Sequence, residues 1–159
     1  MEIRTFAESI LYGASLEEKL LKVGRLTDNR RGERVQAPAA PHRPPGLQLS
    51  DGQAKRAQFP TTAELDHEVA RGRVLHFFAN HELLAMELMA LTLLRFPDAP
   101  STFRRRLVAT IRDEQKHMRL YMERMRALGV ELGEIPLNSF FWDLLSTIDE
   151  PIRFVTGMS

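Results

Sequence analysis

Hydrophobic residues recur at helical spacing over most of residues 61–128, and this pattern predicts two long helices. The first begins at the capping box Thr61-Thr-Ala-Glu64 and nothing breaks it before Phe96, which gives about 30 residues with Gly72 as the weakest position. It is apolar nearly all round over residues 74–94, as is typical of a helix that is buried within a bundle.

The second helix is predicted to begin at Ser101, whose hydroxyl can cap the first turn, and to end at Leu128, just before Gly129. The stretch between the two helices, FPDAP, is short and contains two prolines. Because a short connection makes neighbouring helices run in opposite directions, the two helices are expected to be antiparallel.

The first 60 residues have a different composition. Residues 1–27 predict short helical pieces, with a capping box at Ser15-Leu-Glu-Glu18. Residues 30–60 contain five prolines, which exclude a long helix and predict an extended segment that wraps a surface or is partly disordered. We therefore expect an N-terminal region over residues 1–60 and a helical domain over residues 61–159. The domain includes an aromatic cluster at residues 140–142, and no strand pair is predicted.

Acidic residues interrupt the apolar stripe of each long helix. On a helical wheel, Glu82 lies at the centre of the first stripe, Glu114 in the middle of the second, and His117 at its edge. A buried carboxylate without a partner costs several kcal/mol, so two of them on facing helices need a cation or a proton. The apolar positions of the stripes are Leu75, Phe78, Ala85, Met86, Met89 and Leu93, and Phe103, Leu107, Ile111, Met118, Tyr121 and Met125.

The spacing of these three polar residues favours a metal site. Glu114 and His117 are one helical turn apart, so their side chains point towards the same region. Glu82 precedes Glu114 by 32 residues (114 − 82), which places the two carboxylates at about the same level of an antiparallel pair. A Glu from one helix and a Glu-x-x-His from its neighbour form half of a carboxylate-bridged dinuclear site in a four-helix bundle. Such donors suit iron or manganese, and vacant positions would admit oxygen or peroxide.

The composition excludes several kinds of site and partner. The chain has no cysteine, which excludes disulfides, thiolate zinc sites, iron–sulfur clusters and cysteine nucleophiles. Its 22 basic and 21 acidic residues produce no overall field that would attract nucleic acid. The first residues do not have the pattern of a targeting peptide, and no window offers the roughly 18 uncharged apolar residues of a membrane span. We therefore expect a cytoplasmic protein without a membrane partner.

The segment HFFANHELLAMELMALTLLRFPDAP, together with FRRRLVATIRDEQKHMRLYMERMRALGVELGEIPLNSFFW, resembles the bacterial family known as domain of unknown function 455. That family is similar to the tRNA hydroxylase and rubrerythrin branches of the ferritin-like superfamily. The resemblance implies an all-α, ferritin-like antiparallel bundle of which this chain looks like the N-terminal half. It also implies a di-iron or related dimetal site, with Glu82, Glu114 and His117 at the ligand positions of the first helix pair.

The chain departs from that family in one respect. A full bundle needs a second Glu and a second Glu-x-x-His, and no such motif follows residue 117. The final DEPIRFVTGMS resembles the lead-in to a third helix. The chain is therefore expected to be a fragment, a natural half-protein, or a bundle completed by another subunit. A homodimer or a second chain could supply the other helix pair.

Further polar residues flank the predicted ligands. Glu87 points away from Glu82 on the wheel, so we expect it to be structural or to support the ligands through hydrogen bonds. His81 is expected to be a satisfied polar histidine or such a supporting group. Tyr121 is expected to lie in the core, with a supporting or radical role as the alternative. His67 and His76 are expected to be ordinary surface or groove residues.

The arginines of the second helix are expected to form a solvated face that pairs with acids such as Glu123. The resemblance to a tRNA-modifying branch makes tRNA a candidate partner, although the net charge of +1 gives it little support. The methionines at 86, 89, 118, 122 and 125 are expected to fill the core. The arginines concerned are Arg104, Arg105, Arg106, Arg112, Arg119, Arg124 and Arg126.

These observations favour an oxidoreductase that holds two iron or manganese ions and uses O2 to hydroxylate or oxidise an unknown substrate, with a small molecule as one possibility. The first alternative is a non-catalytic helical scaffold that pairs with another subunit. The second is iron storage or peroxide detoxification. The sequence identifies neither the substrate nor the redox partner.

Overall fold

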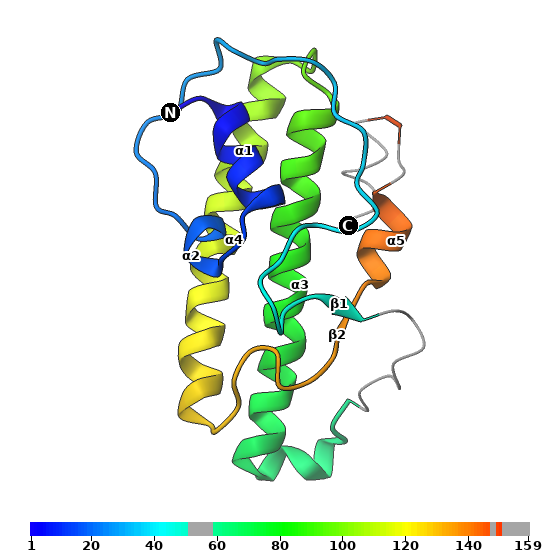
Figure 1. Ribbon diagram of the computed structural model, residues 1–159. Helices are drawn as coiled ribbons and strands as arrows, with labels where there is room; N and C mark the ends of the chain where they lie inside the picture. Colours follow the sequence, from blue (N-terminus) through cyan, green and yellow to red (C-terminus); the bar gives the residue numbers. More distant parts are fainter. Residues whose placement is uncertain (51–58, 147–148, 151–159) are drawn as a thin grey trace.

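The protein is all-α, as predicted. The computed structural model describes residues 1–50, 59–146 and 149–150, and Figure 1 shows the arrangement of the helices. The helices are α1 (Ile3–Tyr12), α2 (Leu16–Lys19), α3 (Glu68–Arg95), α4 (Ser101–Ala127) and α5 (Phe140–Leu145), with a short 3-10 helix at Thr62–Asp66.

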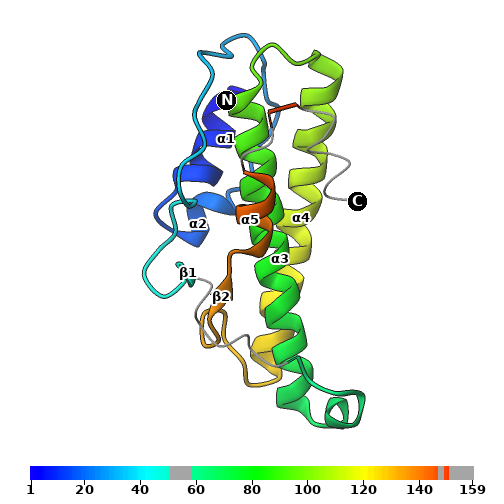
Figure 2. The ribbon, with the colours of Figure 1, turned by 90° about the vertical axis from the view of Figure 1, so that its right-hand side faces the viewer.

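Helices α3 and α4 lie side by side and run antiparallel (Figures 1 and 2). This confirms the predicted helix pair. The end of α4 is also confirmed, because Gly129 has φ +77° and its amide donates to Arg126, while the amide of Val130 donates to Met125. These two bonds form a Schellman motif, in which a left-handed glycine satisfies the last carbonyls of the helix.

The starts of both helices differ from the prediction. The Glu64 carboxylate does accept from the Thr61 amide at 2.7 Å, but this box opens the short 3-10 helix. His67 is then extended, so α3 begins only at Glu68. Ser101 does not cap α4: it is the first helical residue, and its hydroxyl oxygen accepts from Arg31 at 2.6 Å.

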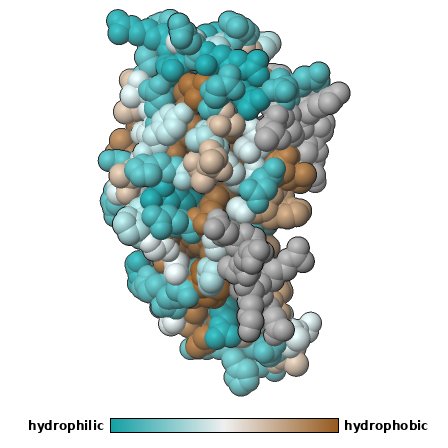
Figure 3. Space-filling view, turned by 45° about the vertical axis from the view of Figure 1, so that its right-hand side comes forward, coloured by the Kyte–Doolittle hydropathy of each residue, from teal (hydrophilic) through white to brown (hydrophobic). Residues whose placement is uncertain are grey.

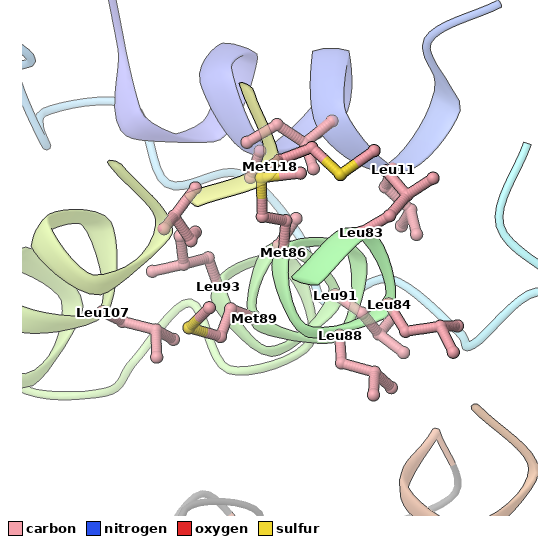
Figure 4. Close-up of a cluster of buried hydrophobic side chains, with 14 of the residues drawn as sticks. Leu11, Leu83, Leu84, Met86, Leu88, Met89, Leu91, Leu93, Leu107 and Met118 are labelled. Atoms are coloured by element: carbon pink, nitrogen blue, oxygen red, sulfur yellow. The ribbon is translucent and has the colours of Figure 1, made fainter. Parts of the chain in front are cut away.

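The core lies between α1, α3 and α4. Figure 4 shows Met86 of α3 and Met118 of α4 turned towards α1, whereas Met89 and Leu107 lie further from it. All five predicted core methionines are buried or half-buried. Helix α3 is long and apolar enough to cross a membrane, but 72% of its most apolar window is buried within the fold. Packing in the core therefore accounts for its hydrophobicity.

The proline-rich segment wraps the helix pair, as predicted, over its described residues 30–50. Arg31 donates to the carbonyls of Pro97 and Ala99, the Val35 amide donates to Leu94, and the His42 amide donates to Leu11. Residues 51–58 of this segment, and most of the final segment from residue 147, lie outside the described residues.

A short two-stranded sheet lies at the C-terminal end of the described wrapping segment. Strand β1 (Leu49–Ser50) pairs in parallel with β2 (Leu137–Asn138), so the expectation of no strand pair was wrong. Each strand has two residues, which is too short for the alternation that reveals a strand in a sequence.

Candidate metal centre

Glu82 of α3 and Glu114 of α4 face each other across the helix pair, with His117 beside them. One donor atom from each of the three side chains lies within 4.8 Å of the others. The Nδ1 atom of His117 is 2.8 Å from Glu114 Oε2 and 3.8 Å from Glu82 Oε1. Antiparallel packing thus brings together the three residues that the sequence selected.

The two carboxylates are mostly enclosed, and the histidine is at the surface. The side chains of Glu82 and Glu114 are 19% and 20% exposed, and that of His117 is 51% exposed. Burial raises the pKa of Glu82 to about 7, and a hydrogen bond that the protonated Glu82 donates to Glu114 and the charge of Glu114 add to this effect. The charge of His117 acts in the opposite direction. Without a bound cation, the pair therefore keeps a proton close to neutral pH.

The donor set fits a metal ion. Two carboxylates and an imidazole are ligands that iron and manganese accept. In the part of the chain that the structure describes, the ion pairs of Glu82 and Glu114 involve His117 and neither Lys nor Arg. No fixed cation among the described side chains therefore already neutralises the two acids.

An aromatic pair lies one helical turn from the ligands. Phe78 precedes Glu82 by one turn, Tyr121 follows His117 by one turn, and their rings stack at 6.1 Å with an interplanar angle of 28°. Phe78 is 42% exposed, whereas Tyr121 is half-buried and packs against the core. A supporting or radical role for Tyr121 stays a prediction.

His81 packs between aromatic rings. Its ring centroid lies 5.0 Å from that of Phe77 on the same helix and 4.3 Å from that of Phe141 on α5. Its Nδ1 atom is buried and has no hydrogen-bond partner among the described residues, so the expectation of a satisfied histidine was wrong. Burial lowers its pKa, which favours the neutral ring. In this position His81 connects α3 to α5.

Glu87 belongs to a separate ion cluster in the core. Its carboxylate lies 3.0 Å from Lys19 Nζ and 2.7 Å from Arg43 Nη2, and the side chains of all three residues are completely buried. Arg43 also donates to Asn80 Oδ1 at 3.2 Å. Burial lowers the pKa of Lys19, and the charge of Glu87 opposes that shift. These contacts favour the structural role for Glu87, because they join α2 and the wrapping segment to α3.

The two remaining histidines of the helical domain differ from each other. His67 is exposed at the start of α3, as expected. His76 is buried, which corrects the expectation of a surface or groove residue, and its Nε2 accepts from the Gly133 amide at 3.0 Å. Burial lowers the pKa of His76. Its role is to hold the loop after α4 against α3.

Three arginines of α4 hold the N-terminal region in place. Arg104 is buried and pairs with Asp28 at 3.1 Å, Arg112 donates to the Gly24 carbonyl at 2.5 Å, and Arg119 donates to the Leu20 carbonyl. The expectation of a fully solvated face was wrong for these three. The other arginines of the run are exposed: Arg105, Arg106, Arg124 and Arg126.

The fold and this geometry define a helical protein with a carboxylate–histidine cluster between two antiparallel helices. Residues 12–156 match the family model described as a protein of unknown function (DUF455), so the chain belongs to that family. This confirms the predicted family. No curated protein and no solved structure matches the chain.

Proposed function

We propose that the protein is a dimetal-carboxylate oxidoreductase of the ferritin-like type, which holds iron or manganese and uses O2 to hydroxylate or oxidise a small molecule. One observation carries this proposal: the donor atoms of Glu82, Glu114 and His117 converge within 4.8 Å at the centre of a helix pair. Redox chemistry requires a cofactor, because no common side chain present here exchanges electrons with O2 by itself.

Each residue has a distinct role in this proposal. Glu82 and Glu114 would hold the ions through their carboxylates, and His117 would hold them through its imidazole. When bound, the ions supply the redox chemistry. Glu82, whose pKa is about 7, releases its proton when a cation arrives.

The metal content of protein purified without oxygen tests the proposal. We expect iron or manganese in the wild type, and a loss of most of it in Glu82→Ala, Glu114→Ala and His117→Ala. Glu123→Ala is the matched control, because Glu123 is an exposed acid on α4 that is not part of the cluster. A wild-type content no higher than that of Glu114→Ala would contradict the proposal.

A second candidate, the helical scaffold, is favoured by the exposed large hydrophobic residues Phe77, Phe78, Leu120, Phe140 and Leu144. A scaffold would assemble equally well with chelator present and would be indifferent to His117→Ala. A third function, iron storage or peroxide detoxification, predicts ferroxidase turnover without any organic substrate. Measuring that turnover distinguishes it from the oxidoreductase and from the scaffold.

A further inference from the structure

We propose that His76 is an acid-sensitive latch, which holds the loop after α4 against α3 while its ring is neutral and releases that loop when the ring takes up a proton. The loop, called the return loop below, consists of residues 129–136 and crosses α3 on its way to β2 (Figure 1). The inference does not depend on the proposed metal function.

Three residues on one side of α3 hold the return loop and the strand that follows it. Gly72 leaves room for the loop to approach the helix. His76 Nε2 accepts from the Gly133 amide at 3.0 Å, and the side-chain amide of Asn80 donates to the Asn138 carbonyl at 3.2 Å. Because residues four apart lie on the same side of a helix, positions 72, 76 and 80 form one line of attachment. His76 is the member of this line that can change its charge near neutral pH.

The bond between His76 and Gly133 requires a neutral ring. An Nε2 atom that accepts from an amide has its lone pair free, so the ring proton is on Nδ1. A second proton would occupy Nε2 and point at the N–H of Gly133, which leaves two donors facing each other. His76 is also only 3% exposed, so the charged ring would lose most of its hydration. Protonation is therefore incompatible with the closed loop.

The surroundings of His76 give an imidazolium little support. Burial lowers the pKa of the ring, and the carboxylate of Glu134 in the return loop raises it as the smaller of the two effects. The buried cluster of Lys19, Arg43 and Glu87 extends to within one helical turn of the ring, and its two cations outnumber its carboxylate. The closed loop thus keeps the ring neutral, whereas an open loop exposes it to water and restores its ordinary pKa.

This difference in pKa fixes the direction and size of the pH effect. The ordinary pKa of the His76 ring is 6.5, and its pKa in the closed loop lies lower. Between these two values the open form binds one proton more than the closed form, so each pH unit of acidification favours opening about tenfold. The attachment is complete above about pH 6.5, and it is lost as pH falls from there towards the pKa of the closed loop.

Opening of the return loop uncovers apolar side chains. Val130 in the loop is 3% exposed, and Leu47, which contacts the loop at Gly133, is 7% exposed. The return loop leads through β2 to α5, on the side of the molecule where Figure 3 shows hydrophobic surface. Release of the loop therefore adds apolar area to a molecule that already carries such a surface, and surfaces of this kind bind other proteins or membranes. The latch links acidification to the exposure of apolar surface.

The amide of Gly133 reports on the latch directly, because it is the donor to His76. Amide hydrogen exchange of the full chain, measured by NMR from about pH 7.5 to about pH 5 and divided by the intrinsic rate at each pH, gives its opening constant. We expect this constant to rise about tenfold per pH unit below about pH 6.5, until the closed ring itself takes up a proton. The amides of Gly129 and Val130 are internal controls, because they donate to carbonyls of α4, and their opening constants should change little.

Two variants identify the group that titrates. His76→Gln keeps an acceptor near the position of Nε2 but takes up no proton at these pH values, so its Gly133 opening constant should not depend on pH. His67→Gln is the matched control, because His67 is an exposed histidine at the start of α3, and it should keep the wild-type slope. Circular dichroism verifies that both variants are folded. A wild-type slope in His76→Gln overturns the proposal.

The wild-type comparison decides the question even if His76→Gln does not fold. A rise in exchange at Gly133 that Gly129 and Val130 do not share supports the latch. A pH dependence that all three amides share overturns it, because groups that titrate in the same range elsewhere, such as Glu82, then act on the stability of the whole fold. An opening constant of Gly133 that stays level from about pH 7.5 to about pH 5 overturns it as well.

Discussion

Arg43 and Glu87, 44 residues apart in the chain, form an ion pair in the centre of the fold. The Nε and Nη2 atoms of Arg43 both donate to the Glu87 carboxylate, which also accepts from Lys19 at 3.0 Å. Because Lys19 comes from α2 and Arg43 from the wrapping segment, one buried carboxylate attaches two N-terminal segments to α3. Removal of that carboxylate would leave two cations in the core without a carboxylate to balance their charge, although Lys19 still donates to the Ile10 carbonyl and Arg43 to Asn80.

We therefore expect Glu87→Gln to lower the free energy of unfolding by about 3–5 kcal/mol, the usual cost of breaking a buried ion pair. Urea unfolding measures the change through the midpoint at constant slope. Glu123→Gln, at an exposed acid on α4, should stay within about 0.5 kcal/mol of the wild type. A Glu87→Gln variant as stable as this control would mean that the cluster contributes little to the fold.

The raised pKa of Glu82 predicts how the stability of the metal-free protein depends on pH. Its folded-state pKa is about 7 and its ordinary value is 4.5. Between these pH values the folded protein holds a proton that the unfolded chain has released. The free energy of unfolding therefore falls as pH rises from about 4.5 to about 7, and the full loss is present above that range.

Urea unfolding at about pH 5 and about pH 8, with chelator present, measures this effect. Burial lowers the pKa values of His76 and His81, so these groups raise the stability as pH rises through about 6.5. Subtracting the unfolding free energy of Glu82→Gln from that of the wild type at each pH cancels the contribution of these two histidines. We expect the wild type to lose more stability with rising pH than the variant when chelator is present. Parallel profiles in chelator would show that Glu82 has an ordinary pKa.

The helix pair and its three polar residues could be predicted because the relevant information is local. Helix α3 is marked by a stretch that is apolar on nearly all sides, α4 by a period of 3.6 residues over its 27 residues, and Gly129 marks the end of α4. Once two helices are antiparallel and joined by a short turn, the sequence separation fixes which residues are level. The carboxylates of Glu82 and Glu114 lie close together for that reason.

The contacts that could not be predicted are made by loops and N-terminal segments. Their paths are not encoded in the spacing of hydrophobic residues. Lys19 and Arg43 reach Glu87 from segments without a repeating pattern, so the wheel could show only that Glu87 points away from Glu82. His76 became buried because the loop at Gly133 returns to α3. Arg119 binds the Leu20 carbonyl rather than water because the N-terminal region runs along α4.

Gly72 illustrates a position whose role becomes visible only in the structure. A Cβ atom there would lie 2.6 Å from Val130 Cγ2, so the glycine allows the loop after α4 to approach α3. We expect Gly72→Ala to cost about 1–3 kcal/mol through overpacking, despite the better helix propensity of alanine. Gly24→Ala is the matched control, because a Cβ atom there meets nothing within 4 Å.

A double variant tests the cause of that cost. Val130→Ala removes the methyl groups that the new Cβ atom would meet, so Gly72→Ala should cost less in this background, with a coupling energy above about 0.5 kcal/mol in urea unfolding. If the two costs simply added, close approach of Val130 would not be the reason for the glycine.

The arginines of α4 that bind main-chain carbonyls predict a local effect on the N-terminal region. Arg112 donates to the carbonyls of Val23 and Gly24, and Arg119 donates to that of Leu20. Without these bonds, residues 20–28 would be held less tightly and would open more often than the rest of the fold. We expect Arg112→Ala with Arg119→Ala to speed amide hydrogen exchange in peptides from residues 16–28 at least tenfold, while exchange in α3 changes little. Arg105→Ala, at an exposed arginine on the same helix, should leave both regions unchanged. Equal acceleration in α3 would instead mean that the arginines stabilise the whole fold and do not act as local attachments.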